Sequence, residues 1–132
     1  FFQSGTFSAH PVTMAAGLAT LNALTPEAIE GLNTLGLQLK DGLNQLFTTN
    51  DIPARAVCTG SVFSLYFTEG PIYNYRDLAQ TDKDPLYPLF LSLIEKGYFL
   101  GGPSLGMCSL STPMDSSHIN GLIAAVAESL TT

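Results

Sequence analysis

The stretch ARAVCTGSVFSLYFT, residues 54–68, decides the fold class of this chain. It is rich in β-branched and aromatic residues, which strands favour, and Thr59-Gly60-Ser61 interrupts it in the middle. The pattern predicts two short strands, or one long strand with a bulge at the glycine. Either interpretation places a small sheet between the helices of the chain.

Two helices are expected before this stretch. His10 followed by Pro11 is typical of a helix start, because proline at the first helical position loses no hydrogen bond. Thr25 and Pro26 repeat the signal, and leucines at three- and four-residue steps then predict an amphipathic helix to about Phe47.

A polar loop at 69–84 is expected after the stretch, followed by a third helix from Asp84-Pro85 to Lys96-Gly97. Short strands are expected at 98–100 and 107–110, and a last helix after Asp115. This order predicts an α+β fold in which helices pack on one face of a small, largely antiparallel sheet.

The composition is that of one globular domain with few charges. The 132 residues include 5 Lys+Arg and 11 Asp+Glu, for a net charge of −6, and 45% are hydrophobic. Five scattered basic residues argue against a nucleic-acid partner, and no apolar run approaches the roughly 18–20 residues of a membrane span. Two explanations of the low charge stay open: a partner covers much of the surface, or the polar side chains of Ser, Thr, Asn and Gln make it soluble.

The sequence contains two cysteines, Cys58 and Cys108. We expect them to be free thiols in a reducing cytoplasm rather than part of a disulfide framework.

Few residues are candidates for chemistry. His10 and His118 lie in no catalytic or metal-binding motif, and the three lysines (Lys40, Lys83 and Lys96) are expected in solvated positions. The segment Ser4-Gly5-Thr6-Phe7-Ser8 is different, because a glycine among hydroxyl residues ahead of a helix can bind a phosphate through backbone N–H groups. The alternative is an ordinary loop and helix cap.

The run SGTFSAHPVTMAAGLATL, residues 4–21, resembles a signature of the class-III pyridoxal-phosphate aminotransferases. It is most similar to the glutamate-1-semialdehyde aminomutase branch, which carries S-G-T-F/L-x-x-N-P-x-x-M-A-A-G. This sequence departs from that pattern at His10, where the branch usually has Asn. Residues 95–100, EKGYFL, resemble the ERGVYL segment of the family, whereas residues 103–107 lack the Glu of the aminomutase pattern P-S-x-F-E-A.

The resemblance extends over nearly the whole chain but only over the C-terminal third of such an enzyme, and the missing initiator Met favours a piece of a longer protein. It implies that residues 1–24 are a loop and connecting helix leading from a missing large domain. Residues 25–132 would be the C-terminal small domain of a fold-type-I transferase. The lysine that binds the cofactor would lie in the missing part, so this piece alone is expected to be inactive.

The resemblance also implies a site. Gly5 and Thr6 would reach across a homodimer to the phosphate of pyridoxal 5'-phosphate in the neighbouring subunit, and the substrate would be a small amino acid or amine. Aminomutase and transaminase activity of the parent enzyme both stay open. A second hypothesis is a stand-alone, non-catalytic dimerisation or interaction domain derived from the same fold.

Overall fold

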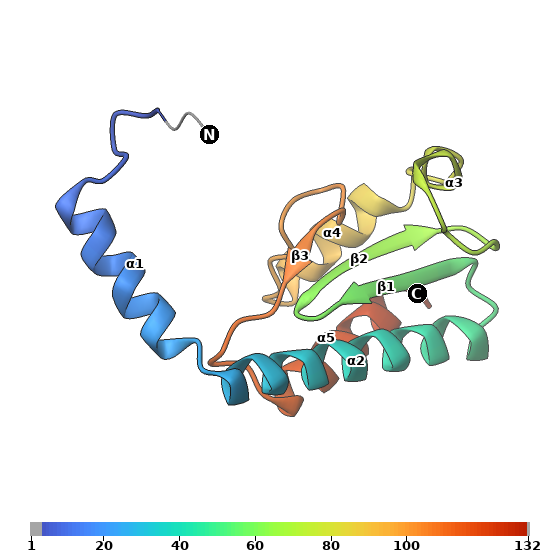
Figure 1. Ribbon diagram of the computed structural model, residues 1–132. Helices are drawn as coiled ribbons and strands as arrows, with labels where there is room; N and C mark the ends of the chain where they lie inside the picture. Colours follow the sequence, from blue (N-terminus) through green and yellow to red (C-terminus); the bar gives the residue numbers. More distant parts are fainter. Residues whose placement is uncertain (1–3, 132) are drawn as a thin grey trace.

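The computed structural model describes residues 4–131 and has an α+β fold, as the sequence predicts (Figure 1). Its helices and strands, in chain order, are α1 (Pro11–Ala23), α2 (Pro26–Thr49), β1 (Ala54–Thr59), β2 (Val62–Phe67), α3 (Tyr75–Ala79), α4 (Leu86–Glu95), β3 (Cys108–Ser109) and α5 (Ser116–Leu130). The strands form one antiparallel sheet in the order β1-β2-β3.

The stretch 54–68 forms two strands rather than one bulged strand. Thr59 pairs with Val62, so Gly60 and Ser61 make a two-residue hairpin loop. Gly60 has φ 59°, and a glycine with positive φ at the first loop position is typical of a type II′ hairpin turn.

Helix α2 packs along β1, and α5 packs beside α2 under the same face of the sheet, where Figure 1 shows both helices below the strands. Gly36 permits the close approach of α2, because a Cβ at this position would collide with the Gly60 carbonyl oxygen. Helix α4 packs on α5. The largest fully buried side chains of the core are those of Leu39, Leu43, Leu65, Leu93, Leu105, Ile119 and Val126.

The predicted strand at 98–100 is wrong. Gly97, with φ 86°, donates its N–H to the Ile94 carbonyl, and Tyr98 donates to the Leu93 carbonyl. These two bonds form the Schellman motif that ends a helix, so the Tyr98 backbone completes α4 rather than a sheet. The predicted strand at 107–110 is correct in place but contains only the two residues of β3.

The loop 69–84 contains a short helix that the sequence analysis did not anticipate. Asn74 caps α3 by accepting hydrogen bonds from the N–H groups of Arg76 and Asp77. The Asp77 carboxylate in turn accepts from the Asn74 N–H, which completes a capping box. Five residues are too few for a hydrophobic period to show in the sequence.

Helix α1 takes no part in the core. It begins after His10 with Pro11 at its first position, as predicted, and none of its residues is buried. Figure 1 shows it extending away from the sheet and the other helices. Side chains of Val12, Met14, Leu18 and Leu21 are 60–71% exposed.

Candidate functional site

The predicted phosphate-binding segment forms a turn immediately before α1. The Ser8 N–H donates to the Gly5 carbonyl at 3.0 Å, which closes a β-turn with Thr6 and Phe7 at its two central positions. The His10 N–H then donates to the Phe7 carbonyl at 3.2 Å. All residues of this turn are exposed.

The turn presents several hydrogen-bond donors without acceptors. Within residues 4–131, neither the N–H groups of Thr6 and Phe7 nor the Thr6 hydroxyl has a partner. A Cβ on Gly5 would lie 3.1 Å from the Ser8 Oγ, so a side chain at this position would crowd the turn. Neutral N–H and hydroxyl donors around a glycine are the groups with which proteins surround phosphate, so this donor set fits a phosphate ester.

The start of α1 adds favourable electrostatic potential for an anion. The N-cap residue His10 makes no side-chain hydrogen bond to the helix, which leaves the first-turn N–H groups available. Its ring instead lies edge-on to Phe7, with the ring centroids 5.9 Å apart. The first lysine or arginine in the sequence is Lys40, so the turn and α1 contain neither residue type.

Two of the three lysines form ion pairs and the third is exposed. Lys40 pairs with Asp41 at 3.3 Å and Lys96 with Glu128 at 3.5 Å, and about a third of each lysine side chain is exposed. Lys83 is exposed. The expectation that none of the three lysines binds a carbonyl group stays a prediction.

His118 takes part in the cap of α5. His118 Nδ1 lies 2.8 Å from Asp115 Oδ1 at the start of α5. Hydrogen bonds from Ser117 and then from His118 hold the pKa of the Asp115 carboxyl well below its usual range. Among the described residues there is no group of three His, Cys, Asp or Glu side chains that could hold a metal ion.

Both cysteines are free thiols, and burial raises the pKa of each. The Cys58 Sγ lies 3.1 Å from the Gly60 carbonyl oxygen, while Cys108 is a buried residue of β3. A raised pKa keeps both in the thiol form, which is the less reactive one.

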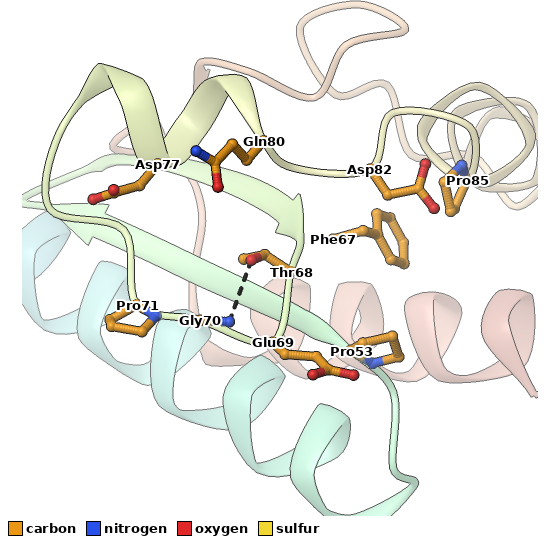
Figure 2. A pocket seen from close by; sticks show the side chains of 10 residues that line it. All are labelled: Pro53, Phe67, Thr68, Glu69, Gly70, Pro71, Asp77, Gln80, Asp82 and Pro85. Carbon is orange, nitrogen blue, oxygen red and sulfur yellow. Dashed lines mark hydrogen bonds between the residues drawn. The ribbon is translucent and has the colours of Figure 1, made fainter.

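An acidic pocket of about 530 Å³, which the sequence did not predict, lies beside α3 (Figure 2). Its walls carry the carboxylates of Glu69, Asp77 and Asp82, and the Gly70 N–H closes one side by donating to the Thr68 hydroxyl at 3.3 Å. Asp77 is engaged in the cap of α3, and Asp82 accepts the Asp84 N–H. Three negative charges make this pocket unsuitable for a phosphate, and the only sequence signal for it was the length of the loop 69–84.

Comparisons with known proteins identify relatives over nearly the whole chain. No protein-family model matches it. The glutamate-1-semialdehyde 2,1-aminomutase of Methanothermobacter thermautotrophicus is 32% identical over 129 residues, which are 98% of this chain and 31% of that protein. The enzyme of the same name from Thermus thermophilus is 31% identical over 131 residues, again 98% and 31%.

Solved structures give the same result. An omega-transaminase from Sphaerobacter thermophilus superposes with a TM-score of 0.87 and 32% identity over 98% of this chain and 30% of that one. A β-phenylalanine aminotransferase from Variovorax paradoxus gives 0.85 and 32% over 97% and 30%. A structure described as a transaminase with PLP bound gives 0.80 and 28% over 98% and 29%. This chain therefore spans about a third of the length of the curated relatives and solved structures that it matches.

Proposed function

Since this chain belongs to the class-III pyridoxal-phosphate aminotransferase family and matches the C-terminal part of its members, we propose that it is the C-terminal part of a longer aminotransferase or aminomutase, called the full-length enzyme below. In that enzyme the turn Gly5–Ser8 binds the phosphate of pyridoxal 5'-phosphate held by the second subunit of a homodimer. The observation that carries this proposal is the set of unpartnered donors on an exposed turn before α1.

The roles of the turn residues follow from their donors. Thr6 donates its N–H and its hydroxyl to phosphate oxygens, and Phe7 adds a second N–H. Gly5 keeps the approach free of a side chain, and the first turn of α1 supplies positive potential. The cofactor, when bound, acts as the electron sink for reactions at the carbon that carries the substrate amino group. The turn contributes by holding the phosphate, and so the orientation of the ring, in place.

Helix α1 supports the assignment of this end of the chain to an interface. Residues 1–26 contain no Asp, Glu, Lys or Arg, and α1 exposes apolar side chains around its circumference. A helix that is apolar on all sides is normally buried on all sides. We assign residues 1–24 to the connection between a large domain and the small domain of 25–132, with α1 covered by the large domain and the partner subunit.

The chain alone is expected to be inactive, because its three lysines are solvated and the residues that bind substrate belong to the large domain. Its substrate in the full-length enzyme is a small amino acid or amine. Addition of pyridoxal 5'-phosphate to the isolated chain should give no absorbance band near the edge of the visible range that depends on Lys40, Lys83 or Lys96.

The free thiols favour a reducing compartment such as the cytoplasm. Within residues 4–131, the helices are too short or too polar to cross a bilayer.

The exposed apolar surface of α1 equally favours the second hypothesis, a stand-alone interaction domain that dimerises through this helix. The two functions differ in what Thr6 does. In an interaction domain, removal of the Thr6 hydroxyl has no effect on any cofactor.

The test is Thr6→Ala in the full-length enzyme, with the equilibrium dissociation constant of pyridoxal 5'-phosphate as the readout. Hydrogen bonds to a charged group contribute roughly 1.5–3 kcal/mol, so the constant should rise about 10- to 150-fold. Thr34→Ala is the matched control, because the Thr34 hydroxyl is exposed on α2 and donates to the Glu30 carbonyl of its own helix. An unchanged constant in Thr6→Ala would refute the phosphate contact.

A further inference from the structure

His10 lies between the exposed turn and α1, and the helix fixes its backbone. Its carbonyl accepts the Met14 N–H at 2.9 Å, which is the first hydrogen bond of α1. Pro11 follows it, and proline favours an extended backbone in the residue before it, as in His10 with φ −61° and ψ 130°. His10 is therefore a fixed point from which the preceding turn can be oriented.

Two interactions join His10 to Phe7, which supplies one of the unpartnered N–H groups of the turn. The His10 N–H donates to the Phe7 carbonyl at 3.2 Å. The two rings meet edge-on, with their centroids 5.9 Å apart and their planes at 75°. Within residues 4–131 the His10 imidazole forms no hydrogen bond or ion pair, so the contact with the Phe7 ring is what this side chain contributes.

The turn has little other support from side chains. Residues 4–9 are all exposed, and in the described part of the chain none of their side chains forms a hydrogen bond or ion pair. Ala9 has φ 58°, a left-handed conformation that is unfavourable for a residue with a Cβ and persists only where its surroundings hold it. The contact between the rings of Phe7 and His10 spans Ala9, so it stabilises the backbone path that joins the turn to α1.

We propose that His10 is a positioning residue for the phosphate-binding turn. Its ring, fixed at the start of α1, holds Phe7 and thereby orients the N–H groups of Thr6 and Phe7 for the phosphate of pyridoxal 5'-phosphate. This inference rests on the proposed function. His10 stands where the aminomutase branch usually has Asn, a strong N-cap residue that bonds to N–H groups of the first helical turn. A ring contact in place of such a cap leaves those N–H groups free for the anion.

The test is His10→Ala in the full-length enzyme, with the equilibrium dissociation constant of pyridoxal 5'-phosphate as the readout. An edge-to-face aromatic pair is worth a change of about 2- to 12-fold in an equilibrium constant, so the dissociation constant should rise by that factor. Phe7→Leu should raise it equally, and the double variant should bind no more weakly than either single variant, because both substitutions remove the same contact. His10→Phe keeps a ring against Phe7 and should restore the constant to within about 1.5-fold of that of the unsubstituted enzyme.

His118→Ala is the matched control, because it removes the other imidazole of the sequence, at the start of α5, and should leave the dissociation constant unchanged. An unchanged constant in His10→Ala would overturn the proposal. Binding by His10→Phe as weak as that by His10→Ala would also overturn it, because the imidazole itself, and not its contact with Phe7, would then hold the cofactor.

Thr6→Ala, measured beside these variants, separates this inference from the function on which it rests. If Thr6→Ala weakens binding and His10→Ala does not, only the positioning role of His10 fails. If Thr6→Ala has no effect, the phosphate contact of the turn fails, and the positioning role fails with it.

Discussion

The side chain of Asn44 on α2 pairs with both backbone polar groups of Ala56 on β1. Asn44 Nδ2 donates to the Ala56 carbonyl at 3.0 Å, and the Ala56 N–H donates to Asn44 Oδ1 at 2.9 Å. Because β1 is an edge strand, these backbone groups have no neighbouring strand to bond with. One amide side chain thus fixes α2 to the sheet and closes the middle of a free edge.

Replacing Asn44 with Leu should destabilise the chain and expose this edge. Both backbone groups of Ala56 would lose their partners, at a cost of about 1–3 kcal/mol in the free energy of unfolding measured by urea denaturation. Gln45→Ala, at an exposed position of the same helix, is the control and should change the free energy by less than about 0.5 kcal/mol. Equal effects of the two substitutions would show that the Asn44 amide has no special role.

Two glycines of α2 should respond to alanine in opposite ways. At Gly36 a Cβ would meet the Gly60 carbonyl oxygen and lie 2.9 Å from Cys58 Sγ, so Gly36→Ala must separate α2 from the hairpin and should cost about 1–3 kcal/mol. At Gly31 nothing lies within 4 Å of a Cβ, so Gly31→Ala should stabilise by about 0.5–1 kcal/mol through helix propensity. Urea denaturation measures both. Stabilisation by Gly36→Ala would mean that α2 and the hairpin pack less closely than described.

Acidification should weaken the start of α5 through Asp115. Its pKa in the folded chain lies below the usual value of 3.8, so the ionised form stabilises the fold. That contribution is complete above the pKa of the unfolded state and is lost as the pH falls from about 4 through the lower pKa of the folded state. Asp115→Asn keeps a side chain that can cap the helix but does not titrate.

The free energy of unfolding, measured from pH 5 downward, should therefore fall more steeply in the unsubstituted chain than in Asp115→Asn. Gln45→Ala, at an exposed position of α2, removes no titratable group and is a control that should leave the pH dependence of the chain unchanged. Parallel curves for the unsubstituted chain and Asp115→Asn would contradict the assignment of the depressed pKa.

Most of the fold could be predicted because its signals are local. The glycine at 60 between two β-rich runs gives the hairpin, and Thr25, Gly97 and Asp115 mark helix ends through hydrogen bonds to neighbouring residues. The prediction of a strand at 98–100 was wrong, because an apolar run does not show that the Tyr98 N–H bonds to the end of α4. Contacts between residues far apart in the sequence, such as that of Asn44 with Ala56, had no sequence signal.

The candidate site, too, could be predicted only in part from the sequence. The sequence was enough to select Gly5 and Thr6 as candidates, because they lie in a run that resembles a family signature. The β-turn that leaves donors unpartnered depends on a bond between Gly5 and Ser8 that the sequence does not specify. The phosphate contact itself stays a prediction, because it joins two subunits and this structure describes one chain.

A hybrid dimer of the full-length enzyme tests the central claim most directly. One subunit carries Thr6→Ala and keeps the lysine that binds the cofactor, whereas the other keeps Thr6 and lacks that lysine. If Thr6 serves the neighbouring subunit, the single lysine-containing site is complete and should bind pyridoxal 5'-phosphate with the affinity of the unsubstituted enzyme. An affinity lowered about 10-fold or more, as in the Thr6→Ala homodimer, would show that the turn serves its own subunit and would contradict the account.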